Sequence, residues 1–209
     1  MFDVWCLMRL LIRFAQQSLI DANFQKVHFI THSMGVRLFA SAMKSPEFRE
    51  LFRPRSGESL NEDKQITMQS VILCNPDHPV KDFRDNVFDF IKLFCCNTTI
   101  YVDRNDTALK SAAIVTRIKR LGSLHEPLLT HVRRGKPLDL DIVDASGLQD
   151  NMHNVRHSAF NLNRVMVEDI RDIVVSHKRA YNRSSRLVNK QANYYSFMTT
   201  PSIVNGNVV

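Results

Sequence analysis

Four short apolar runs, each closed by polar residues, constrain the fold of this chain more than any other feature. They are Val27–Ile30, Ser70–Cys74, Thr98–Val102 and Leu138–Val143. Segments with helical spacing of apolar residues lie between them, as in Met34–Lys44. Nearly continuous apolar runs are typical of parallel strands buried on both faces. The pattern therefore predicts an α/β fold with a mostly parallel sheet of about four strands, flanked by helices.

The remaining segments set the expected domain boundaries. The spacing of apolar residues predicts further helices at residues 2–22, 83–94, 107–116 and 161–180. Residues 53–65 are polar and include proline and glycine, which is typical of a surface loop. Beyond residue 182 the sequence is polar and aperiodic. We therefore expect one domain over residues 1–182 and a disordered tail over residues 183–209.

Charge and cysteine content exclude several classes of function. The formal net charge of the 209 residues is +7, but the basic residues cluster weakly and are not interleaved with aromatic ones. We therefore expect no nucleic-acid partner. The apolar N-terminus is interrupted by Asp3, Arg9 and Arg13, which excludes a membrane span and makes a poor signal peptide.

The four cysteines suggest a compartment. No pair of them has zinc-ligand spacing, and vicinal cysteines do not easily bridge to each other. They are Cys6, Cys74, Cys95 and Cys96. We expect reduced thiols and a cytoplasmic location.

The turn after the first apolar run carries the strongest functional signal. The run leads through Thr31 and His32 to Ser33, and a helix begins almost at once. Ser33 is either a helix N-cap or a nucleophile. Gly35 stands where a tight turn favours a residue without Cβ, and Thr31 is small. The motif is thus G-x-S-x-G with threonine in the first place, and the Met34 N–H would be an oxyanion donor.

Several further motifs complete a resemblance. They are "THSMG", "VILCNPD", "YVDRNDTALK", "LDLDIVDASG" and "RHSAF". Together these motifs resemble a family of uncharacterised α/β hydrolases within the esterase/lipase superfamily, over residues 27–175. The resemblance implies the α/β-hydrolase sheet and a serine hydrolase that cleaves small-molecule carboxylic esters without a cofactor.

The resemblance also implies the partners of Ser33. The family's acid falls on Asp106, in Asp106-Thr107-Ala108-Leu109, and its histidine falls on His157. Ser33 would be the nucleophile and His157 the general base, while Asp106 would orient the imidazole.

Each assignment has an alternative. Asp106 could simply cap the helix that follows it, and Asp103 or Asp77 could supply the acid. His157 could be a surface histidine, with His153 as the competing base.

Two other groups are expected to have no catalytic role. His32 precedes the serine and is expected to be structural. Asp139, Asp141 and Asp144 alternate along the last expected strand and suggest a metal site only weakly. We expect them to face solvent and expect no metal.

The resemblance covers only the second half of an α/β-hydrolase sheet. Neither early strands nor the loop that normally gives a second oxyanion donor precede the first run. We therefore expect a truncated domain with an open edge at Val27–Ile30, a tendency to self-associate, and weak or absent activity. The alternative function is a non-catalytic hydrolase-like module that binds a ligand or partner.

Overall fold

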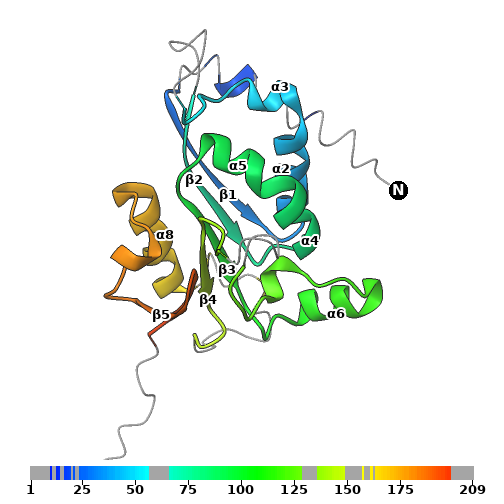
Figure 1. The fold of residues 1–209 in the computed structure, drawn as a ribbon, viewed down its shortest axis with the longest axis vertical. Coiled ribbons are helices and arrows are strands. Elements are labelled where there is room, and N and C mark those ends of the chain that lie inside the picture. Colours follow the sequence, from blue (N-terminus) through cyan, green and yellow to red (C-terminus); the bar gives the residue numbers. More distant parts are fainter. Residues whose placement is uncertain are drawn as a thin grey trace, which may run out of the picture.

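A six-stranded sheet forms the centre of the computed structural model (Figure 1). The strand order is β1-β2-β3-β4-β6-β5. The strands are β1 (Lys26–His32), β2 (Thr67–Cys74), β3 (Thr98–Val102), β4 (Asp141–Asp144), β5 (Leu187–Gln191) and β6 (Tyr194–Phe197). The pairings from β1 through β4 to β6 are parallel, whereas β5 is antiparallel to β6. The predicted α/β fold with a mostly parallel sheet is confirmed.

The structure describes most of the chain between residues 24 and 198. The described residues are 24–56, 66–128, 136–148 and 163–198, together with 10, 13–14, 17–19, 21, 157 and 161. The helix expected at residues 2–22 lies mostly outside them, although its described positions from Leu10 onward are helical. Cys6 and His153 also lie outside the described residues.

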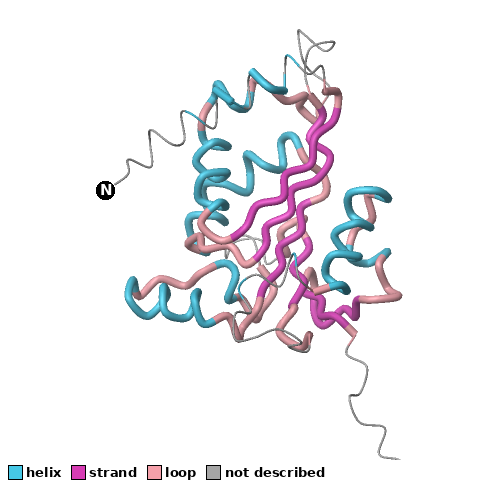
Figure 2. Tube along the Cα trace, turned by 180° about the vertical axis from the view of Figure 1, so that it is seen from behind, coloured by secondary structure: helices cyan, strands magenta, loops and turns pink. Residues whose placement is uncertain are grey.

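Helices cover both faces of the sheet (Figures 1 and 2). One face carries α2 (Gly35–Lys44), α3 (Pro46–Arg49), α4 (Val80–Asp82), the π-helical turn η2 (Phe83–Val87) and α5 (Phe88–Phe94). The opposite face carries α8 (Arg164–Ser176). Alternate residues of β2 enter the two cores: Val71 and Leu73 pack toward α2, and Ile72 and Cys74 toward α8. Burial on both faces explains why this strand is apolar throughout.

Three short helices lie outside these two layers. They are α6 (Thr107–Thr116), η3 (Leu121–Ser123) and η5 (Ala180–Asn182). In both views α6 stands out from the body of the molecule (Figures 1 and 2). It begins after Asp106, whose side chain accepts a hydrogen bond from the Leu109 N–H, and ends at left-handed Arg117. A side-chain cap commonly marks the N-terminus of a helix, and a left-handed residue commonly marks its C-terminus.

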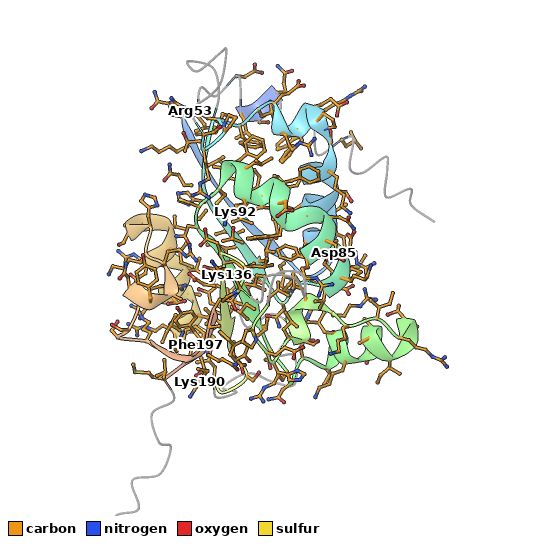
Figure 3. The ribbon with its side chains drawn as sticks, in the orientation of Figure 1. Arg53, Asp85, Lys92, Lys136, Lys190 and Phe197 are labelled. Carbon is orange, nitrogen blue, oxygen red and sulfur yellow. The ribbon has the colours of Figure 1, made fainter. Side chains whose placement is uncertain are left out.

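Residues 183–198 belong to the fold, so the expected disordered tail and the boundary at residue 182 are wrong for this segment. β6 pairs with β4, which gives the sheet six strands rather than about four. The Arg183 side chain is fully buried, where it donates hydrogen bonds to Asp169 and, at 3.3 Å, to the Tyr101 hydroxyl. The ring of Phe197 (Figure 3) stacks on that of Tyr101, with centroids 6.3 Å apart. Tertiary contacts thus order a segment that lacks a clear hydrophobic pattern.

The two edges of the sheet differ in sequence. β1 forms one edge, at the expected position, and its Ile30 is 47% exposed. A hollow of about 280 Å³ follows this edge, touches the consecutive residues 29–32 and is covered on one side by α2. The other edge, β5, presents exposed polar side chains, including Lys190 (Figure 3). A polar or charged edge resists pairing with another chain, so among the described strands β1 has the edge whose sequence is more prone to pairing.

No helix in the described part of the chain is both long and apolar enough to cross a membrane.

Candidate active site

Ser33 occupies a sharp turn between β1 and α2. Its φ is 51°, a left-handed conformation that residues other than glycine rarely adopt. The Ser33 N–H donates to the Cys74 carbonyl at 3.0 Å, and the Ser33 carbonyl accepts from the Asp77 N–H at 3.1 Å. The end of β2 therefore holds the strained backbone of Ser33 on both sides.

Five described residues other than glycine have a positive φ, and two of them lie at this edge of the sheet. Arg117 and His177 end helices, and Ala192 lies in the β5–β6 turn, where such conformations are common. Ser33 and Asn75 instead follow the ends of two adjacent strands. Strain of about 1–3 kcal/mol per residue persists only where the surroundings fix it, and such positions cluster at functional sites.

The N-cap alternative for Ser33 does not hold in the structure. The residue at the cap of α2 is Met34, and no side chain caps this helix. The backbone N–H of Met34, at this N-cap, has no carbonyl partner within the helix. The sequence led us to expect that the tight turn at Gly35 needs a residue without Cβ. A Cβ built at Gly35 would meet no described atom within 4 Å, so the space around this residue does not require glycine.

His157 bridges Ser33 and Asp106. Its Nε2 lies 2.7 Å from the Ser33 Oγ, and its Nδ1 lies 2.6 Å from Asp106 Oδ2. Because a carboxylate accepts hydrogen bonds, the proton of a neutral imidazole belongs on Nδ1, and Nε2 accepts from the serine hydroxyl. The structure thus brings together the three residues that the family resemblance indicates, from segments that are more than fifty residues apart.

Asp106 is both a helix cap and the partner of His157. Its Oδ1 accepts from the Leu109 N–H at 3.0 Å. Its Oδ2 accepts from His157 and also from the Asn75 side-chain amide at 2.8 Å. Both Asp106 and Asn75 are buried. The two interpretations of Asp106 are therefore compatible, because each uses a different carboxylate oxygen.

His32 supports the same histidine from the neighbouring position on the chain. Its Nε2 lies 2.7 Å from the His157 carbonyl oxygen and donates to it, and the two rings are 4.6 Å apart. Burial lowers the pKa of His32, which favours a neutral ring near pH 7. The expectation of a structural role is thus made specific, since His32 holds the backbone of His157. Sequence patterns indicated neither this contact nor that of Asn75.

The alternative acids lie elsewhere. Asp77 forms ion pairs with Arg37 at 2.9 Å and with Arg120 at 3.1 Å. Asp103 is buried, and its Oδ1 accepts from the Asn105 N–H at 2.7 Å. The carboxylate on His157 Nδ1 is that of Asp106.

The three aspartates near β4 take part in ion pairs and hydrogen bonds with the C-terminal segment. Asp141 and Asp144 are buried, so the expectation that all three face solvent is wrong. Arg179 binds Asp141 and Asp139, each at 2.9 Å, and Asp144 accepts from the Tyr194 hydroxyl at 2.7 Å. These ion pairs and hydrogen bonds join the C-terminal segment to the sheet. Across the described residues, no group of three His, Cys, Asp or Glu side chains is arranged to hold a metal.

Comparisons with known proteins agree with this fold. A family model described as an alpha/beta hydrolase of unknown function (DUF900) matches residues 10–175. The matched range includes Ser33, Asp106 and His157. Searches of the curated proteins and of the solved structures found no similar chain.

Proposed function

The chain belongs to these alpha/beta hydrolases of unknown function, and from that premise we propose that it hydrolyses carboxylic esters with Ser33 as the nucleophile. The observation that carries the proposal is the continuous hydrogen-bond chain from Ser33 Oγ through His157 to Asp106. A serine hydroxyl is too weak a nucleophile to attack an ester unless an adjacent base takes its proton. His157 is within hydrogen-bonding distance for that transfer.

The reaction would follow the two-step course of acyl transfer. Ser33 Oγ bonds to the ester carbonyl carbon while its proton moves to His157 Nε2. The tetrahedral intermediate then expels the alcohol, which takes that proton, and leaves an acyl-Ser33. Water gives a proton to the same nitrogen and attacks the acyl carbon; the bond from that carbon to Ser33 Oγ then breaks, the proton returns from Nε2 to Oγ, and the carboxylic acid is released. Asp106 keeps the Nδ1 proton in place and stabilises the imidazolium formed in each step.

The turn would also supply an oxyanion donor. The Met34 N–H follows the nucleophile directly and lies at the N-cap of α2. Amides at a helix N-terminus carry a partial positive charge that favours negative oxygen. Loss of one such donor typically slows the reaction by about 10²–10³-fold.

A fluorophosphonate probe tests the proposal directly. It phosphonylates an activated serine, and peptide mapping locates the adduct. We expect an adduct on Ser33, none in Ser33→Ala, and unchanged labelling in Ser185→Ala, which alters an exposed serine before β5. Labelling that persists in Ser33→Ala, with the fold intact, would contradict the proposal.

A further inference from the structure

Helix α6 exposes an adjacent pair of large apolar side chains. Ile114 is 77% exposed and Val115 is 84% exposed. These are the highest values for any large apolar side chain in the part of the chain that the structure describes. Isolated exposed apolar residues are common on soluble proteins, but an adjacent pair on a protruding helix forms a local apolar surface.

The pair lies on the face of α6 that points away from the protein. Leu109 is the buried residue of this helix and marks its inner face. With about 100° between successive residues, Ile114 and Val115 lie about 140° and 120° from Leu109, on opposite sides of the point directly across the helix. Ile118, just beyond the helix, is 45% exposed. Ile114 and Val115 therefore flank the outermost positions of α6, which the exposed small residues Thr107 and Ser111 occupy, and no described core lies against them.

The charged residues of α6 and of the three residues that follow it are all basic. The segment Thr107–Lys119 contains Lys110, Arg117 and Lys119 and no acidic residue. All three cations are exposed. Lys119 lies 3.8 Å from Glu126, whereas the buried Arg120 serves Asp77 inside the protein and is not part of this surface. Exposed apolar residues flanked by cations are typical of helices that bind the interface of anionic membranes.

We propose that the outward face of α6 docks on an anionic lipid surface. Ile114 and Val115 would enter the boundary between headgroups and acyl chains, while Lys110, Arg117 and Lys119 contact the anionic headgroups. A nucleic acid or an acidic protein would match the cations but would leave the apolar pair in water. This inference does not rest on the proposed hydrolysis. The proposed lipid-binding face and the candidate active site are nevertheless adjacent along the chain, because Asp106, the partner of His157, is the N-cap of α6.

Vesicle co-sedimentation of the full chain tests the proposal. The vesicles contain phosphatidylcholine alone or phosphatidylcholine with phosphatidylserine, at about 0.05 M and about 0.5 M salt. We expect binding to the anionic vesicles that weakens at high salt. The double variant Ile114→Glu/Val115→Glu should lose at least about tenfold in partitioning. The matched control is Val175→Glu, which changes a 66% exposed valine of α8 and should bind normally.

A second variant separates charge from apolar contact. Lys110→Glu/Arg117→Glu leaves Ile114 and Val115 in place and should lower binding to anionic vesicles by about tenfold. The proposal is overturned if the wild-type chain does not bind, if it binds both kinds of vesicle equally, or if Val175→Glu weakens binding as much as the α6 variants do. Binding of polyglutamate that equals vesicle binding and is insensitive to Ile114→Glu would also overturn it, in favour of an acidic polypeptide partner.

Discussion

Replacing Asp106 by asparagine is expected to disable the site while it leaves most of the fold intact. Asp106 Oδ2 accepts two hydrogen bonds, from His157 Nδ1 at 2.6 Å and from the Asn75 amide at 2.8 Å. If the new amide keeps its oxygen toward the Leu109 N–H, its NH₂ group faces two donors. His157 then favours the other tautomer, with its proton on Nε2, and no longer accepts the proton of Ser33.

The substitution is expected to have two separate effects, one on kcat and one on the stability of the fold. The same change in a well-studied triad lowers kcat by about 10⁴-fold, and we expect a loss of that order here. The effect on folding is smaller, because one buried hydrogen-bond mismatch costs about 1–3 kcal/mol. If the amide turns instead, so that its oxygen faces His157, the helix cap is lost at about 1 kcal/mol. At about 2–4 °C for each kcal/mol in a chain of this length, the two arrangements lower Tm by about 2–12 °C.

The assay is the rate of hydrolysis of a p-nitrophenyl ester, measured with Tm for each variant. Asp77→Asn is the control, since it alters a nearby buried aspartate that pairs with Arg37 and Arg120 rather than with His157. Asp77→Asn should lower Tm and change kcat much less than Asp106→Asn. If Asp77→Asn abolishes hydrolysis and Asp106→Asn does not, the assignment of the acid is wrong.

Three further changes probe the surroundings of the site. His32→Gln keeps a donor near the position of Nε2 and should preserve kcat, whereas His32→Phe should lower kcat by about tenfold with KM unchanged; equal losses in the two would contradict the positioning role. Gly122→Ala would place a Cβ 2.7 Å from the Asn75 carbonyl carbon, so we expect a loss of about 1–3 kcal/mol in the free energy of unfolding by urea, and an unchanged midpoint would refute this. We also expect the β1 edge to pair with a second copy of the chain, so Ile30→Lys should shift the sedimentation equilibrium toward the monomer. Val188→Lys, on the β5 edge, should leave that equilibrium unchanged. A wild-type chain that is monomeric at every concentration would refute the pairing.

The sequence predicted the elements that are stabilised by their own hydrophobic pattern. β3 and α6 lie at their expected residues, and β2 extends the expected run by three residues at its start. The hairpin of β5 and β6 was missed because it lies in a mostly polar segment, where its few buried apolar residues form no clear pattern and are ordered by pairing with β4 and by the buried Arg183. Such tertiary contacts have no local signature.

The site could be predicted from the sequence to a similar extent. Ser33 stood out because a strand runs into a turn and a helix, and local order of that kind is visible in sequence. His157 lies on a segment without periodicity, so only the family resemblance indicated it. Asn75 and His32 gave no signal, since their roles depend on contacts with Asp106 and His157 across distant segments.

Arg183 is synthesised after both of its buried partners, and this order affects when the second face of the sheet can be covered during synthesis. Its partners Tyr101 and Asp169 precede it by 82 and 14 residues. At about 5–20 residues per second, Tyr101 waits roughly 4–16 s for this arginine to be made. Removing one partner of a buried ion pair costs about 3–5 kcal/mol, which disfavours closure of α8 over β3 until Arg183 follows Asp169, about 1–3 s later at the same rate. Until the arginine leaves the ribosome, the apolar face of β2 and β3 remains open to chaperones and to other nascent chains.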